Sequence, residues 1–234
     1  MVKIGINCGH TVDGQPGSGA VGYISESTET RKVGNKLTLL LLKAGHEVYN
    51  CTNDFAPNTS KNLLEIVRMA NAQPLDLFVS IHFNSGGGRG TEVYTYGGKS
   101  FKEAENTCKA IEKLGFKNRG IKDGSGLYVI KHTEARSMLI EVCFVDTADA
   151  ELYKEIGAEH IAGAICEAIT GKEANNMAGF KDTKGHYAEG HINKLKEMGI
   201  VNGDNNGNFR PNDTITRADA AIMVANAIRY FTGK

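Results

Sequence analysis

The chain lacks a surplus of either charge, and this absence holds along its whole length. Its 234 residues carry 27 basic and 27 acidic side chains, so the formal net charge is zero. Residues 1–172 carry 19 basic and 20 acidic groups, and residues 173–234 carry 8 and 7. Proteins that bind nucleic acid usually carry a basic excess. We therefore expect no nucleic-acid partner, and no strong dependence on charge in binding a polyanion.

Long apolar runs are also absent. Runs such as Leu39–Leu42 are far below the ~20 residues that a transmembrane helix needs, so we expect no membrane partner. The N-terminus, residues 1–5, lacks the charged and apolar regions of a signal peptide. We expect cytoplasmic synthesis followed by release, or secretion if a leader has been removed.

Cysteine is sparse and carries no metal-binding spacing. The five cysteines form no CxxC pair, which argues against a zinc ribbon. Most of them lie in apolar stretches, so we predict reduced core residues. Cys8 lies in a predicted buried strand, whereas activated cysteines favour helix N-termini, and this disfavours a cysteine nucleophile.

Apolar runs and helical spacings alternate through the first three quarters of the chain. The runs predict strands at Val2–Cys8, His46–Cys51, Leu75–His82, Thr91–Tyr96, Leu127–Ile130 and Met138–Phe144. Helical spacings predict helices at Glu26–Ala44, Asn62–Asn71, Ser100–Leu114 and Ala148–Ile169. This alternation predicts an α/β fold with a mainly parallel central sheet flanked by helices.

The last quarter of the chain has a different pattern. Residues 172–178 are polar and without periodicity, which is typical of a linker. Two helical stretches, His186–Met198 and Thr216–Ala227, flank a polar loop at Asn202–Asp213. Residues 179–234 therefore predict a small all-α helix–loop–helix module. Roughly 55 residues are marginal for independent folding, so we expect this module to pack on a copy of itself or on the first domain.

Polar residues follow or interrupt the apolar strands. His10 follows the first strand, His82 ends the third, and Glu141 lies inside the last. Carboxyl ends of parallel strands share one crevice, so these side chains are predicted to converge. Two histidines and a carboxylate can hold zinc with one position open, and a second carboxylate, Glu26 or Glu29, can serve as a base. The alternative is structural: strand-end histidines, and acids that favour a helix start.

Several motifs occur in the order found in one enzyme family. They are Asn7-Cys8-Gly9-His10, Glu26, Ser80-Ile81-His82-Phe83-Asn84-Ser85 and Ser137–Phe144. This set resembles the zinc-dependent N-acetylmuramoyl-L-alanine amidases of the amidase-3 family over residues 2–170. The resemblance implies an amidase-3-like fold and a catalytic domain at residues 1–171.

The resemblance also implies a reaction and its residues. His10, Glu26 and His82 would bind Zn²⁺, and Glu141 would be the catalytic carboxylate. The reaction would be hydrolysis of the amide between N-acetylmuramic acid and L-alanine in peptidoglycan by a zinc-activated water. The alternatives are a zinc-dependent cell-wall peptidase and a wall-binding protein that has lost catalysis.

The chain departs from the family pattern at three positions. Family members usually have an acidic residue, a glycine and an asparagine where this chain has Asn7, Thr11 and Thr30. These departures weaken the assignment of Glu26 more than those of the two histidines.

The C-terminal residues carry a second resemblance. The segments Phe180-Lys181-Asp182, His186-Tyr187-Ala188, Gly199–Gly203, Gly207–Pro211 and Ile215–Ala220 follow in order. They resemble one S-layer homology (SLH) module. The resemblance implies binding to a secondary polymer of the Gram-positive cell wall, with Arg217 as a contact to an anionic sugar. Such modules usually act in threes, so we expect a homotrimer or weak binding. The two modules together resemble a phage or prophage endolysin, or an autolysin.

Overall fold

The computed structural model describes residues 1–171, 180–204 and 206–232. The chain divides into two compact units, Met1–Glu173 and Ala174–Lys234, and each is described by itself. The linker predicted at residues 172–178 lies outside the described residues. Within the described ranges, every helix is too short or too polar to cross a membrane.

The first unit is built on one sheet of six strands in the order β2-β1-β3-β6-β4-β5. The strands are β1 Lys3–Cys8, β2 Glu47–Asn50, β3 Leu77–Asn84, β4 Thr91–Thr95, β5 Asn118–Asp123 and β6 Arg136–Phe144. The sheet is mainly parallel, as predicted. One pairing differs: β4 runs antiparallel to β6 and parallel to β5. The first residues of β4 and β5 therefore lie at the same edge as the last residues of β1, β3 and β6.

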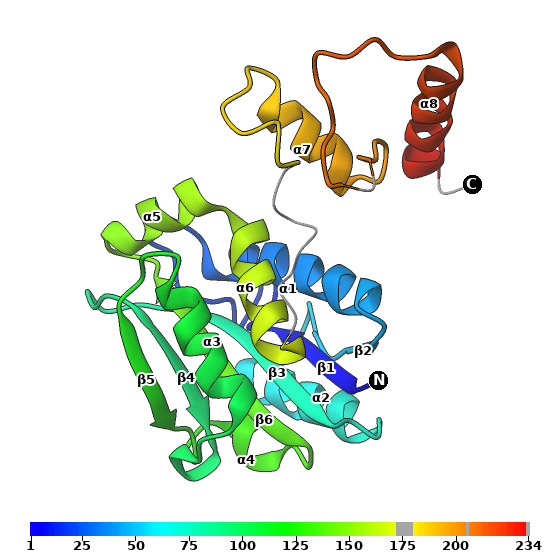
Figure 1. Ribbon diagram of the computed structural model, residues 1–234. Helices are drawn as coiled ribbons and strands as arrows, with labels where there is room; N and C mark the ends of the chain where they lie inside the picture. Colours follow the sequence, from blue (N-terminus) through cyan, green and yellow to red (C-terminus); the bar gives the residue numbers. More distant parts are fainter. Residues whose placement is uncertain (172–179, 205, 233–234) are drawn as a thin grey trace. The chain divides into compact units, whose positions relative to one another are not determined.

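Helices flank both faces of this sheet, as predicted. They are α1 Glu26–Lys43, α2 Thr59–Asn71, α3 Lys102–Glu112, α4 Tyr128–His132, α5 Ala148–Ile156 and α6 Ala158–Thr170, with a 3-10 turn at Tyr96–Gly98. Helices α1, α3 and α6 pack together on one face, and α2 and α4 lie on the other (Figure 1). Along β3, Val79 and Ile81 face the larger core and Phe78 the smaller, as the alternation of side chains in a strand requires.

Local signals fix the start and the packing of α1, the helix that carries Glu26. The side chain of Ser25 accepts a hydrogen bond from the Thr28 amide and caps the helix. Gly34 lies against β1, where an added Cβ would come within 2.3 Å of Cys8 Sγ. Cys8 and the other four cysteines are buried free thiols, as predicted.

Three local predictions were wrong. Residues 127–130 were expected to form a strand but begin the short helix α4, because a four-residue apolar run does not distinguish a strand from a buried helical turn. The strand β5 was not predicted, since its residues are half-buried or exposed and give no apolar signal. The last predicted helix is two helices, α5 and α6, divided at Gly157, whose φ is 82°.

The second unit contains α7 Glu189–Glu197 and α8 Arg217–Thr232, which match the two predicted helices. Its core is built on Phe180, whose ring stacks on Phe209 at 5.1 Å between centroids. Thr216 caps α8, because its hydroxyl accepts a hydrogen bond from the Asp219 amide. The same hydroxyl donates to the Asp219 carboxylate.

Candidate functional site

The predicted polar residues lie at one edge of the sheet, where the parallel strands β1, β3 and β6 end. His10 follows β1, His82 is near the end of β3, and Glu141 lies opposite His82 in the pairing of β3 with β6. Glu26 is the first residue of α1, which starts at this edge. The topology therefore brings four residues together that are far apart in the sequence.

Three of these side chains point their ligand atoms at one place. Glu26 Oε1 lies 3.1 Å from His10 Nε2 and 3.1 Å from His82 Nδ1. One ligand atom from each of the three residues falls within 4.8 Å of the others. Two imidazole nitrogens and one carboxylate oxygen form the donor set of many catalytic zinc sites. The chemistry and convergence of these donors therefore fit a zinc ion.

Two glycines leave the space that this arrangement needs. A Cβ at Gly9 would come within 2.4–2.6 Å of the His82 ring, and a Cβ at Gly19 would come within 2.6 Å of Glu26 Oε2. Neither contact is possible without displacing the histidine or the glutamate. Side chains are therefore excluded from both positions while His82 and Glu26 keep their places.

The backbone of His10 is held in a conformation that is rare for a residue with a side chain. Its φ is 65°, in the left-handed region. The Arg31 guanidinium from α1 donates to the carbonyl oxygens of Gly9 and His10, and also to Asp54. Arg31 thus ties the turn after β1 to α1.

His10, Glu26 and His82 form a triad. Burial opposes charge on each of these side chains, and their contacts with one another favour it. Burial opposes ionisation of Glu26, but its polar contacts with His10 and His82 outweigh burial and hold the pKa of Glu26 well below its usual value. Burial also opposes charge on His10, yet Glu26 raises its pKa above the ordinary value. For His82 burial dominates, and its pKa is lowered. A carboxylate and a neutral imidazole are the forms that bind a metal.

Glu141 is in the opposite electrostatic situation. Its Oε2 is buried and has no hydrogen-bond partner within the described residues. Burial, with the nearby negative charges of Glu26 and Glu92, raises the pKa of Glu141 to about 8. A buried carboxyl without a partner is costly, so a proton or a cation is needed beside it.

Glu92 is a neighbour that the sequence did not reveal. It lies near the start of β4, is paired with Glu141 in the antiparallel register of β4 and β6, and is 2% exposed. Its carboxylate accepts hydrogen bonds from Asn84, Tyr94 and Arg119, the last at 2.6 Å. These partners satisfy Glu92, whereas Glu141 has none of them. The sequence analysis could not place Glu92 beside Glu141, because it did not predict that β4 runs antiparallel to β6.

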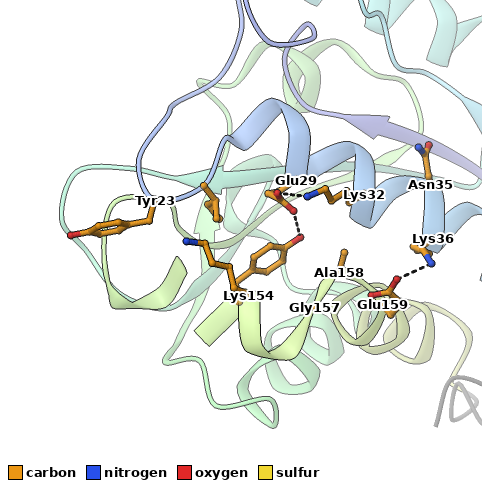
Figure 2. Close-up of a pocket in the computed structure, with 11 residues that line it drawn as sticks. Tyr23, Glu29, Lys32, Asn35, Lys36, Lys154, Gly157, Ala158 and Glu159 are labelled. Atoms are coloured by element: carbon orange, nitrogen blue, oxygen red, sulfur yellow. Dashed lines mark hydrogen bonds and ion pairs between the residues drawn. The ribbon is translucent and has the colours of Figure 1, made fainter. Parts of the chain in front are cut away.

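Glu29, the other candidate carboxylate of α1, points elsewhere. It accepts from the Tyr153 hydroxyl at 2.9 Å and pairs with Lys32 at 2.7 Å. These residues line a separate hollow of about 640 Å³ between α1 and the junction of α5 and α6. Figure 2 shows Glu29 joined to Lys32 among the residues that line this hollow. The geometry thus places Glu26, and not Glu29, in the triad.

Arg217 lies in the second unit, at the first residue of α8, and its side chain is exposed. No ion pair joins it to another residue in the ranges that the structure describes. The structural salt bridge that could explain an arginine here is therefore not seen among those residues.

Comparisons with known proteins show the family to which the first unit belongs. Residues 4–171 match the Amidase_3 family, described as N-acetylmuramoyl-L-alanine amidase. The chain belongs to this amidase family. Residues 179–221 match the S-layer homology domain, so an SLH domain follows the Amidase_3 domain.

Similar proteins include named amidases and endolysins. The chain is 30% identical to N-acetylmuramoyl-L-alanine amidase CwlM of Bacillus licheniformis, over 76% of this chain and 68% of CwlM. It is 30% identical to the endolysin of Bacillus phage SPP1, over 70% of this chain and 63% of the endolysin. Two Clostridium perfringens proteins without an assigned function are 36% and 34% identical, and this chain spans 52% and 54% of their lengths.

Solved structures share the fold of the first unit. The catalytic domain of the CD27L endolysin, which targets Clostridium difficile, superposes with a TM-score of 0.67 at 27% identity, over 74% of this chain and 99% of that domain. The catalytic domain of the amidase CwlV from Bacillus (Paenibacillus) polymyxa gives 0.61 at 28% identity, over 73% and 97%.

Proposed function

We propose that the chain is a peptidoglycan hydrolase that cleaves the amide between N-acetylmuramic acid and L-alanine. One observation carries the proposal: His10, Glu26 and His82 converge within 4.8 Å beside Glu141, on a domain of the amidase family. The names of CwlM and CwlV support the choice of bond. The domain boundaries at residues 1–171 and 179–234 are part of the proposal.

His10, Glu26 and His82 would hold a zinc ion. When bound, zinc would act as a Lewis acid toward the scissile carbonyl and toward the attacking water. Glu26 is poised for this role because its carboxylate stays ionised although it is buried. His82 is poised because burial keeps its imidazole neutral.

Glu141 would move the proton. Its Oε2 is buried and lacks a hydrogen-bond partner among the described residues, so this oxygen is free to accept the proton of the attacking water. The same carboxyl would then donate this proton to the leaving nitrogen of L-alanine. A group whose pKa is about 8 without metal can take and release a proton near neutral pH. Arg119 would neutralise Glu92 and leave Glu141 as the proton carrier of the site.

The products of digestion test this proposal. Purified Gram-positive peptidoglycan is digested with the full chain, and the soluble fragments are analysed by mass spectrometry. We expect glycan strands whose muramic acid carries no peptide, and peptides that begin with L-alanine. New amine ends inside stems that remain attached to glycan would establish a peptidase instead. Absence of any product would indicate a binding protein that has lost catalysis.

A pair of variants ties the products to the site. Glu141→Gln keeps the shape of the side chain but cannot carry the proton, so it should keep zinc and lose turnover by about 10²-fold or more. Glu155→Gln, an exposed position on α5, serves as the matched control and should leave turnover unchanged. Full turnover in Glu141→Gln would exclude Glu141 as the base.

We also propose that the SLH domain anchors the enzyme to a secondary polymer of the Gram-positive wall. Arg217 is exposed and offers the bidentate guanidinium that suits an anionic sugar. On α8, Ile222 and Val224 are 56% and 60% exposed, and exposed apolar side chains such as these support self-association of the module as a homotrimer. Light scattering of the full chain combined with a wall-pelleting assay tests this. A monomer with full wall affinity would contradict the trimer.

A further inference from the structure

Two buried polar residues lie on the Nε2 side of the His82 ring. Asn7 of β1 and Ser80 of β3 are paired in the register of these strands, and they are 1% and 0% exposed. Ser80 Oγ lies 2.7 Å from Asn7 Oδ1 and 3.1 Å from His82 Nε2. A chain of hydrogen bonds therefore joins Asn7 to the ring nitrogen that does not face Glu26.

The direction of this chain follows from its far end. The amide nitrogen of Asn7 lies 3.1 Å from the carbonyl oxygen of Cys51 and 3.5 Å from that of Cys8. Backbone carbonyls only accept hydrogen bonds, so the amide nitrogen must face them and the amide oxygen must face Ser80. That oxygen cannot donate. The single hydroxyl proton of Ser80 is therefore used on Asn7, and Ser80 Oγ can only accept from His82.

The proton of His82 is consequently required on Nε2. A neutral imidazole has one ring proton, so Nδ1 keeps the lone pair that a metal ligand needs. Glu26 Oε1, which faces Nδ1, already has the Phe83 amide and His10 Nε2 at 3.1 Å each. Nδ1 also lies 3.1 Å from Glu26 Oε1, a contact that a metal ion bound to Nδ1 would replace, whereas the Ser80 hydroxyl oxygen can accept from this ring only if the proton is on Nε2.

We propose that Asn7 and Ser80 are positioning residues that fix the His82 proton on Nε2 and so present Nδ1 as the metal-binding nitrogen. The metal-binding half of this statement rests on the proposed function; the location of the proton does not. The asparagine at position 7, where the family usually has an acid, fits its surroundings. A carboxylate there would place an oxygen against the carbonyls of Cys51 and Cys8.

Nuclear magnetic resonance locates the proton directly. Long-range ¹H–¹⁵N spectra of the full ¹⁵N-labelled chain are recorded at pH 8, without metal and with one equivalent of zinc, and His82→Ala assigns the signals. We expect a protonated Nε2 in both states and a zinc-bound Nδ1 in the second. An unprotonated Nε2 in either state would overturn the proposal. Failure to bind zinc would refute the proposed function, while the metal-free spectrum would still decide the position of the proton.

Variants of the two residues test the consequence for binding. In Ser80→Ala the Nε2 proton loses its acceptor, and in Asn7→Leu the Ser80 proton is free to turn toward Nε2. Each should weaken zinc binding about 10–100-fold in a chelator competition. The control is Ser137→Ala, a buried serine of β6 whose hydroxyl donates to a backbone carbonyl, and its affinity should be unchanged. Wild-type affinity in both variants would contradict the proposal. If a variant does not fold, the wild-type spectra decide it.

Discussion

The stability of the metal-free protein should fall as pH rises from 5 to 8, and Glu141→Gln should remove most of this fall. Burial raises the pKa of Glu141 from 4.5 to about 8. Below pH 4.5 the carboxyl is protonated in both the folded and the unfolded states, and its full contribution to stability is present. As pH rises, the unfolded chain releases the proton first, so stability is lost until the folded state also releases it near pH 8.

The size of this loss of stability follows from the difference between the pKa values of Glu141 in the unfolded and folded states. Each pKa unit corresponds to about 1.36 kcal/mol. Between pH 5 and pH 8 the wild type should lose about 3 kcal/mol that Glu141→Gln does not lose. For a unit of this size this is a difference of about 6–12 °C in melting temperature. Comparing the change with pH, instead of absolute stability, cancels the cost of burying the new amide.

Urea denaturation followed by far-ultraviolet circular dichroism measures this, because the chain has no tryptophan to report unfolding. The protein is treated with a chelator and unfolded at several pH values, with Glu155→Gln as the control. Added zinc should reduce the difference, since a nearby cation favours the carboxylate. A wild type and a Glu141→Gln variant whose stabilities change in parallel between pH 5 and pH 8 would refute this reasoning.

Three further predictions concern other parts of the chain. Gly9→Ala places a Cβ against the His82 ring and should weaken zinc binding by about tenfold or more; unchanged affinity in a chelator competition would show that His82 has room to move. Tyr153→Phe leaves one oxygen of Glu29 without its buried hydroxyl donor and should lower the free energy of unfolding by about 1–3 kcal/mol; a loss below about 0.5 kcal/mol in urea denaturation would contradict the bond's role. Binding of the full chain to cell walls should change little with added salt, because both halves are nearly neutral; a steep loss in a pelleting assay would show that charge drives the binding.

Much of the site could be predicted because strand order in a parallel sheet is a strong constraint. His10 follows a buried strand, His82 lies near the end of another and Glu141 lies inside a third, and the carboxyl ends of parallel strands meet at one edge. The spacing of residues in the sequence could not decide whether Glu26 or Glu29 meets the histidines. Both lie in the first turn of α1, and only the rotation of the helix about its axis decides which carboxylate meets the histidines.

Strand β5 and the position of Glu92 were missed because the hydrophobic pattern of this part of the sequence is weak. The edge strand β5 is polar and half-exposed, so it gave no signal. Without β5 and the reversal of β4, neither the pair of Glu92 with Arg119 nor its place beside Glu141 could be foreseen. The relay through Asn7 and Ser80 was hidden for another reason, since it depends on which backbone carbonyls surround the asparagine.

The zinc content of purified protein tests most directly whether His10, Glu26 and His82 hold a metal ion. The wild-type chain, Glu26→Gln and Glu29→Gln are purified, loaded with zinc, dialysed and analysed for metal. We expect about one zinc per chain in the wild type and in Glu29→Gln, and a large loss in Glu26→Gln. A wild type that retains no zinc, or a loss in Glu29→Gln but not in Glu26→Gln, would contradict it.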